Sequence, residues 1–198
     1  NHDFKRLIDC VVSAKNLKDI ALILITHEHF DHFDKNAIEE IVAKENCGVV
    51  AHDNILQDLN IERRFKFPIK MNQEITLKNM NITALPAHHP KAFYPLGFLL
   101  SFNGFNVFHA GDTELLNSFS DIKADVAILP IGGTYTMDCV DAVRAVKIMK
   151  PNYVIPMHYD TFEGIEQDPK EFKQRIEKSV LKTKPIILKP GQKVKIKA

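Results

Sequence analysis

Cysteine is scarce in this sequence, where Cys10, Cys47 and Cys139 are the only three among 198 residues. An odd number of cysteines without CxxC spacing excludes a zinc ribbon and argues against a disulfide framework. Reduced thiols of this kind are typical of proteins in reducing compartments. We therefore expect a cytoplasmic protein.

The sequence also lacks an excess of either charge and any long apolar run. It has 26 Lys and Arg against 25 Asp and Glu, a net charge of +1 with histidine neutral. The overall charge therefore gives no reason to expect nucleic acid or an anionic membrane as a partner. No apolar run reaches membrane-spanning length, and no signal-peptide pattern is present. We expect a small-molecule substrate and no membrane association, while a homo-oligomer stays open.

Length and local patterns predict a single α/β domain over residues 1–198. Capping boxes predict helices that begin at Asn36 and Asp168, and apolar spacing predicts another over 137–150. Asn103-Gly104 predicts the turn of a β-hairpin. Strands are predicted at 20–25, 48–51, 74–77, 80–85, 97–102, 105–109, 125–131, 153–156, 185–189 and 194–196. This order, β-α-β, a β meander and then β-α-β-α-β, favours mixed sheets with helices on both sides.

The segment Thr26-His27-Glu28-His29-Phe30-Asp31-His32 directly follows the apolar run at 20–25. Imidazole nitrogens and carboxylate oxygens are the usual ligands of zinc and similar divalent metals. A turn that leaves a buried strand can aim these four donors into one cavity, and an unpaired buried carboxylate would otherwise be costly. The segment therefore predicts a metal site.

Further donors follow the ends of other predicted strands, where open α/β folds place their active sites. The complete set is His27, His29, Asp31, His32, one of His88 and His89, Asp112 and His158. Seven donors suit two metals that share a bridging carboxylate and a bridging hydroxide. Two metals roughly 3.5–4 Å apart acidify the bridging water and polarise the scissile oxygen. The donors accept zinc, manganese, iron or nickel, so the identity of the metal stays open.

The pattern His27-Glu28-His29-Phe30-Asp31-His32 resembles the HxHxDH motif of the metallo-β-lactamase-fold hydrolases, and His89, Asp112 and His158 fall in that family's order. More narrowly, the chain resembles predicted metal-dependent hydrolases related to ascorbate-6-phosphate lactonase. That resemblance rests on the segments 109–113, 129–138 and 156–159, which read HAGDT, LPIGGTYTMD and PMHY. The similarity extends from about residue 8 to about residue 191.

The resemblance implies a metallo-β-lactamase-like four-layer αββα sandwich with mixed sheets. Members of the family usually begin with a strand pair whose first turn carries Gly-His. We expect this chain, which starts at Asn1 rather than methionine, to lack that first strand and to be truncated.

The resemblance also implies the role of each ligand. His27, His29 and His89 would hold the first metal, Asp31, His32 and His158 the second, and Asp112 would bridge them. Asp31 would also orient or deprotonate the attacking water, which makes it the catalytic residue. Zn²⁺ is favoured, with Mn²⁺, Fe²⁺ and Ni²⁺ as alternatives.

Other residues have both functional and structural interpretations. His88, His109, Tyr135 and Tyr159 are candidates for substrate contacts or for support of the ligands, and Tyr135 could equally pack in the core. Asp138 and Asp141 are interpreted as residues of a first helical turn, where the helix dipole favours carboxylates. His2 and His52 are interpreted as structural.

We expect a hydrolase that attacks an ester, lactone or phosphate-ester small molecule with a metal-bridging hydroxide. One alternative is a nucleic-acid phosphodiesterase of the same fold, which the near-neutral charge disfavours. Another is a diiron redox enzyme of the flavodiiron type, whose members carry glutamate where this chain has His29. The last is a metal-holding binding protein without catalysis.

Overall fold

The structure is a computed structural model that describes residues 6–180 and 182–196. His2 lies outside these residues. No helix among them is long and apolar enough to cross a membrane.

The first part of the chain forms a small parallel sheet with the strand order β1-β2-β3. Its strands are β1 (Leu22–Leu24), β2 (Gly48–Ala51) and β3 (Lys66–Pro68). The helices α1 (Lys35–Glu45) and α2 (Asp53–Asp58) connect them. The side chain of Asp34 caps α1, which therefore begins one residue before the predicted Asn36.

The rest of the chain forms a seven-stranded mixed sheet with the order β10-β9-β8-β7-β6-β5-β4. Strands β4 to β7 pair antiparallel, whereas β7 to β10 pair parallel. Its elements are β4 (Glu74–Leu77), β5 (Met80–Pro86), β6 (Leu96–Phe102), β7 (Phe105–His109), β8 (Val126–Pro130), α3 (Cys139–Met149), β9 (Tyr153–Met157), α4 (Pro169–Ser179) and β10 (Lys184–Pro185). The predicted β-α-β unit, β meander and β-α-β-α-β order are present, while α2 and β3 were not predicted.

Local turn chemistry fixes the hairpins of this sheet. Asn103 and Gly104 both have positive φ, 50° and 78°, as the turn between two antiparallel strands with a right-handed twist requires. Lys78 and Asn79 have φ of 52° and 62° between β4 and β5. Both predicted hairpins are therefore present.

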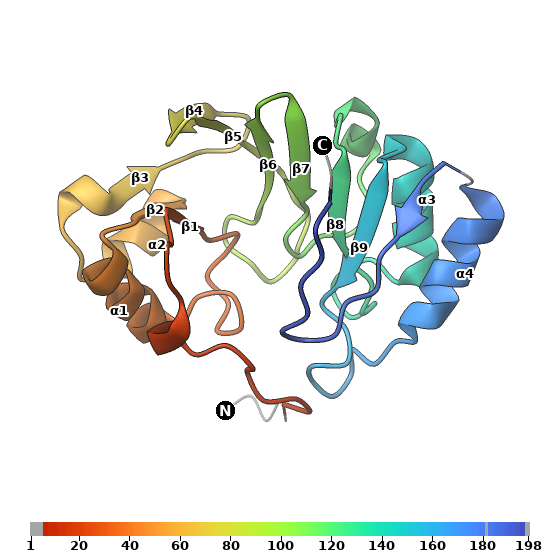
Figure 1. The fold of residues 1–198 in the computed structure, drawn as a ribbon, viewed down its shortest axis with the longest axis horizontal. Helices are drawn as coiled ribbons and strands as arrows, with labels where there is room; N and C mark the ends of the chain where they lie inside the picture. The colour runs from red at the N-terminus through yellow and green to blue at the C-terminus, as the bar shows by residue number, and fades with distance from the viewer. Residues whose placement is uncertain (1–5, 181, 197–198) are drawn as a thin grey trace.

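The helices lie on opposite outer sides of the molecule, with both sheets between them (Figure 1). Side chains of α1 and α2 pack on the small sheet, and those of α3 and α4 on the large one. A third apolar cluster, with Val50 of β2, Ala84 of β5 and Phe98 of β6, joins the two sheets. These layers match the expected αββα sandwich.

One predicted strand is wrong, and two are at most half as long as predicted. Residues 194–196 form no strand although their pattern alternates, and Val194 is 45% exposed. In the described residues the strand at that end of the large sheet is β10, which has only two residues, Lys184–Pro185, and therefore offers 194–196 too short an edge to pair with. The strand predicted at 185–189 is only Lys184–Pro185, and the run at 20–25 contributes only Leu22–Leu24, which is half-buried rather than buried on both faces.

Candidate metal centre

The loop that follows β1 is held by its backbone against both sheets. Ile25 N–H donates to Val50 C=O in β2, and Leu96 N–H of β6 donates to Thr26 C=O. Further along, the His32 N–H donates to the His29 C=O, which closes a tight turn. The loop therefore leaves the small sheet already positioned beside the large one, with His27 fully buried.

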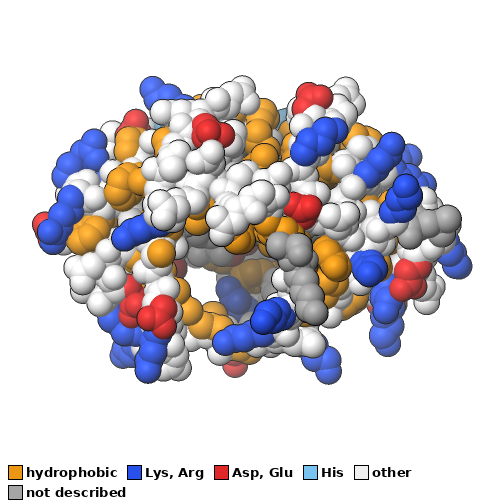
Figure 2. Space-filling view, turned by 45° about the horizontal axis from the view of Figure 1, so that its top comes forward, with side chains coloured by type: hydrophobic (Ala, Val, Ile, Leu, Met, Phe, Trp, Pro, Cys, Tyr) orange, Lys and Arg blue, Asp and Glu red, His pale blue; other side chains and the backbone are white. Residues whose placement is uncertain are grey.

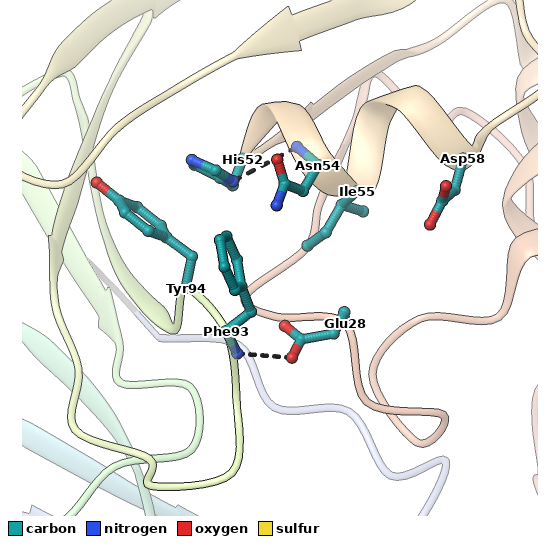
Figure 3. A pocket seen from close by; sticks show the side chains of 7 residues that line it. All are labelled: Glu28, His52, Asn54, Ile55, Asp58, Phe93 and Tyr94. Atoms are coloured by element: carbon teal, nitrogen blue, oxygen red, sulfur yellow. Dashed lines mark hydrogen bonds between the residues drawn. The ribbon is translucent and has the colours of Figure 1, made fainter.

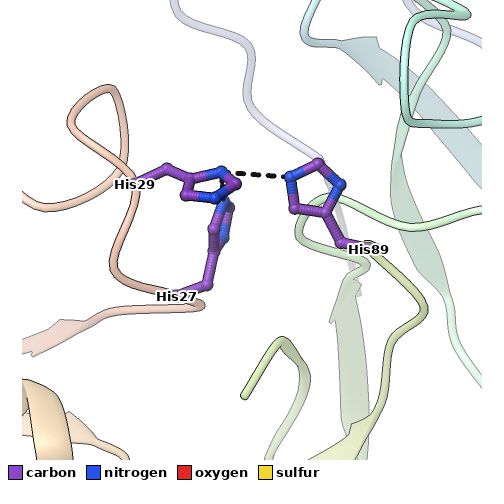
Figure 4. Close-up of side chains that lie close together, drawn as sticks. All are labelled: His27, His29 and His89. Atoms are coloured by element: carbon purple, nitrogen blue, oxygen red, sulfur yellow. Dashed lines mark hydrogen bonds between the residues drawn. The ribbon is translucent and has the colours of Figure 1, made fainter. Parts of the chain in front are cut away.

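Three imidazoles converge at this junction (Figure 4). His29 Nδ1 lies 3.2 Å from His27 Nε2 and 3.1 Å from His89 Nε2. His89 comes from the segment after β5, sixty positions further along the chain than His29. We call these three residues the trihistidine group.

The outer nitrogens of the group show that the inner ones carry lone pairs. His29 Nε2 lies 3.1 Å from the Lys91 C=O, and His89 Nδ1 lies 3.0 Å from the Tyr135 C=O. A carbonyl only accepts, so each outer nitrogen carries the proton. His29 Nδ1 and His89 Nε2 are then bare acceptors that face each other, an arrangement that a cation between them satisfies.

A second group of donors lies beside the first. Asp31 Oδ2 is 3.6 Å from both His32 Nε2 and His158 Nε2. His158 follows β9 and adopts φ of 55°, a left-handed conformation that is uncommon for a residue with a side chain. This second group therefore brings together donors from the loop after β1 and a donor from the segment after β9 of the large sheet.

Asp112 connects the two groups. Its Oδ2 lies 3.1 Å from His158 Nε2, 3.3 Å from His32 Nε2 and 4.0 Å from His89 Nε2. Gly111 precedes it with φ of 64°, and a Cβ at that position would lie 2.7 Å from the Leu96 C=O. Only glycine lets the backbone approach β6 this closely and so carry Asp112 to the centre.

The electrostatics of the centre follow from burial and close charges. Burial and the neighbouring His32 lower the pKa of His27 to about 3. Burial would raise the pKa of Asp112, but the neighbouring imidazoles of His158 and His32 hold it well below its usual range. Burial would lower the pKa of His158, yet the carboxylates of Asp112 and Asp31 raise it to about 10.

These residues fit divalent metal ions. Ligands at 2.0–2.1 Å around tetrahedral zinc lie about 3.3 Å from one another, close to the 3.1 and 3.2 Å spacings of the trihistidine group. His32 Nε2, Asp112 Oδ1 and both ring nitrogens of His158 are buried and have no hydrogen-bond partner among the described residues. Buried polar atoms without partners are costly, and metal coordination removes that cost. The donors within reach of one another form the sets His27, His29, His89; His27, His32, Asp112; and Asp31, His32, His158.

The remaining sequence candidates lie around the centre. His88 is exposed and pairs through Nδ1 with Glu114 at 3.0 Å, so His89 rather than His88 faces the donors. His109 Nδ1 accepts from the Gly111 N–H at 3.1 Å, and burial lowers its pKa to about 4. It therefore supports the turn to Asp112. Tyr159 packs against the core of the large sheet.

A cavity of about 230 Å³ opens onto the centre, with His29, Asp31, His89, Asp112 and His158 in its wall. Its other walls include Phe30, Tyr135 and Phe162, and also Lys91, which the sequence did not single out. The Ala92 N–H donates to the His89 C=O, which makes His89 to Ala92 a turn with Pro90 in its favoured second place. That turn, directly after a ligand, was the available signal for Lys91.

A second, smaller cavity of about 130 Å³ lies behind the motif loop (Figure 3). Glu28 points into it, and its carboxylate accepts the Phe93 N–H at 2.6 Å. The His52 ring stacks on Tyr94 with centroids 3.9 Å apart, and its Nδ1 accepts from the Asn54 N–H at the start of α2. The contacts of Glu28 and of His52 are structural, as expected for His52. They support the loop after β1 on the side opposite the metal donors.

Comparison with known proteins places the chain among related sequences. Residues 3–159 match the family model described as the Beta-lactamase superfamily domain. A UPF0173 metal-dependent hydrolase of Methanosarcina mazei is 31% identical over 88% of this chain and 81% of its own length. One of Pyrobaculum arsenaticum is 36% identical over 88% of this chain and 80% of its own length. The solved structure of Igni18, a metallo hydrolase from Ignicoccus hospitalis, superposes with a TM-score of 0.81, at 34% identity over 91% of this chain and 80% of that one.

Proposed function

This chain belongs to the beta-lactamase superfamily and, within it, to the UPF0173 metal-dependent hydrolases, and from that premise we propose that it hydrolyses an ester, lactone or phosphate-ester small molecule with two divalent metal ions, preferably Zn²⁺. The predicted family and its α/β fold with mixed sheets are confirmed, and the chain is a metal-dependent hydrolase. The narrower resemblance to hydrolases related to ascorbate-6-phosphate lactonase stays a prediction.

The observation that carries the two-metal proposal is the position of Asp112. Its Oδ2 approaches donors of both groups, His89 at 4.0 Å on one side and His158 at 3.1 Å on the other. A carboxylate between two sets of three donors is the arrangement that suits two ions and one bridge. In this proposal His27, His29 and His89 hold one ion, and Asp31, His32 and His158 the other.

Two divalent ions would acidify a water molecule and polarise the scissile group. The side chains of the protein would hold these ions and orient the water. Burial would raise the pKa of Asp31, but the nearby imidazoles of His158 and His32 lower it, so Asp31 is an ionised acceptor at neutral pH. We assign Asp31 the role of orienting the attacking water and accepting its proton.

The cavity and the surface favour a small molecule over nucleic acid. A volume of about 230 Å³ suits a small organic substrate. On the face in Figure 2, Lys and Arg side chains are scattered among acidic and apolar ones rather than gathered into a basic patch. The experiment below distinguishes this proposal from a nucleic-acid phosphodiesterase, a diiron redox enzyme and a non-catalytic metal-holding protein. We also keep the proposals of a cytoplasmic location and of no membrane partner, and a homo-oligomer stays open.

The first experiment combines metal analysis with turnover. We expect about two divalent ions per chain, and hydrolysis within a panel of lactones, carboxylic esters and phosphate esters. Asp31→Asn should lower kcat/KM by at least about 100-fold, since it removes the acceptor of the proton. Asp58→Asn, a matched change in the second cavity, should leave kcat/KM unchanged.

Three results would contradict the proposal. Full metal loading with no turnover across the panel would support a metal-holding protein. Redox-active iron with oxygen consumption would support the diiron alternative. Cleavage of RNA or DNA that weakens steeply with salt would support the phosphodiesterase.

A further inference from the structure

Lys91 and Tyr135 form a polar pair at the cavity that opens onto the metal centre. Lys91 Nζ donates to the Tyr135 hydroxyl at 2.8 Å and also lies 4.1 Å from the centroid of its ring. Both side chains line the cavity together with the donors.

The backbones of the same two residues hold ligands of the trihistidine group. The Lys91 C=O accepts from His29 and the Tyr135 C=O accepts from His89, at 3.1 and 3.0 Å. The backbones of Lys91 and Tyr135 are therefore tied to the reacting centre. A group that their side chains bind is held close to that centre.

The backbone conformation of Tyr135 indicates that its side chain has a functional role. Its φ is 58°, in the left-handed region where a residue with a bulky side chain is strained and glycine is not. The side chain is 43% exposed, so burial of the ring does not explain an aromatic residue there. Strain of this kind often marks a ligand-binding position.

The Lys91 ammonium at the cavity wall has no carboxylate partner among the described residues. Among the described residues, no carboxylate lies within ion-pair distance of Lys91 Nζ, although Glu163 also lines the cavity. Phe30 and Phe162 meet edge to face at 5.8 Å and supply an apolar wall. The Arg6 guanidinium lies 4.6 Å from the centroid of Phe162 and adds a second cation beside that wall.

We propose that Lys91 and Tyr135 select substrates that carry a carboxylate or phosphate next to an apolar portion. This inference rests on the proposed hydrolase function. The anionic group replaces Tyr135 as the acceptor from Lys91 Nζ, and the Tyr135 hydroxyl donates to it. The apolar portion packs on Phe30 and Phe162, and the scissile bond then faces the metal centre.

Binding of matched probes to the metal-loaded protein tests the inference without turnover. Benzylsuccinate and 3-phenylpropanoate share an aromatic ring and one carboxylate, and only benzylsuccinate has a second carboxylate for Lys91. By calorimetry, the unchanged protein should bind benzylsuccinate at least tenfold more tightly than 3-phenylpropanoate. Lys91→Ala should remove this preference, and Tyr135→Phe should reduce it about threefold to tenfold. Metal content is measured in every variant, so that lost metal is recognised.

Two further variants and one further probe sharpen the result. Lys91→Arg should keep most of the preference, and Lys147→Ala on the outer helix α3 should keep all of it. A probe with phosphonate in place of the second carboxylate distinguishes the two anions. The one whose binding falls more in Lys91→Ala is the preferred class.

The inference is overturned if the unchanged protein shows no preference for benzylsuccinate, or if Lys91→Ala weakens both probes equally. Its failure is distinguishable from that of the hydrolase proposal. Binding that depends on Lys91 without turnover of any substrate would remove the proposed reaction alone. Turnover with binding that ignores Lys91 would remove this inference alone.

Discussion

His88 and His89 face opposite sides of the chain although they are adjacent. Side chains alternate along an extended backbone, so a pair of neighbours cannot both enter one cavity. His89 reaches the trihistidine group, whereas His88 pairs with Glu114 at the surface. At 28–32 the chain turns instead of running extended, and this turn places Glu28 in the wall of the second cavity and Phe30 in the wall of the first. Neighbouring positions of the loop therefore bind the metal, support the loop or line the cavity.

The thiols give a prediction at the residue scale. Cys10 is exposed, whereas Cys47 and Cys139 are 1% and 2% exposed. Burial raises the pKa of Cys47, and it raises that of Cys139 to about 11. A thiol reacts as its thiolate, so one thiol per folded chain should react rapidly with a disulfide reagent at pH 8, and three in urea. Cys10→Ser should abolish the rapid reaction, and two rapid thiols in the folded protein would contradict the buried assignments.

At the scale of elements, strand direction gathers the donors. Because β5 and β7 each pair antiparallel with β6, they run in the same direction, and β8 and β9 continue parallel to β7. The carboxyl ends of β5, β7 and β9 therefore meet at one edge of the sheet. His89, Asp112 and His158 follow these three ends, and the loop after β1 comes to the same edge.

Local signals predicted the elements that place the donors, and they failed where the determinants are not local. Asn103-Gly104 forms its turn without help from the rest of the fold, so its hairpin was readable. Whether His88 or His89 faces the donors depends on which side of one extended segment each side chain lies. Only packing in the folded protein decides this. Lys91 meets Tyr135 across 44 positions of sequence. The helix α2 and the strand β3 are short, and their patterns are too brief to stand out.

The N-terminal cap of α3 gives a prediction at the scale of elements. The Asp138 carboxylate accepts the Asp141 N–H at 2.8 Å. Asp138→Ala should lower the free energy of unfolding by about 1 kcal/mol in urea titrations, since an orphan N–H loses its acceptor. Asp138→Asn should restore most of it. Asp141→Ala removes an exposed contact with Arg144 and a favourable charge in the first turn, and it should cost less, so an equal loss would contradict the capping role.

At the scale of the whole molecule, the centre joins two halves that have separate cores. The loop after β1 supplies His27, His29, Asp31 and His32, and the large sheet supplies the other three donors. Apolar contacts between the sheets, such as Val50 with the cluster around Phe98, also connect the halves, as does the hydrogen bond from the Leu96 N–H to the Thr26 C=O. Metal binding should therefore stabilise the arrangement of the two halves.

Removal of metal tests this connection. An ion at 100 times its Kd stabilises a protein by about 2.7 kcal/mol, and each kcal/mol moves the Tm of a chain of this size by about 2–4 °C. Chelation should therefore lower the Tm by at least about 5–10 °C, the effect of a single ion, and added Zn²⁺ should restore it in calorimetry. His158→Ala should shrink this metal-dependent shift, and His88→Ala should preserve it. If the Tm does not change after verified loss of the metal, then metal binding does not stabilise the fold and this prediction is wrong.

The distance along the chain between the first and last donors also bears on biosynthesis. The motif at 27–32 leaves the ribosome long before His158 is made. At about 5–20 residues per second, the delay is on the order of ten seconds. Each set of three donors includes one that is made later, His89, Asp112 or His158. The finished centre can therefore form only after the strands of the large sheet have been made.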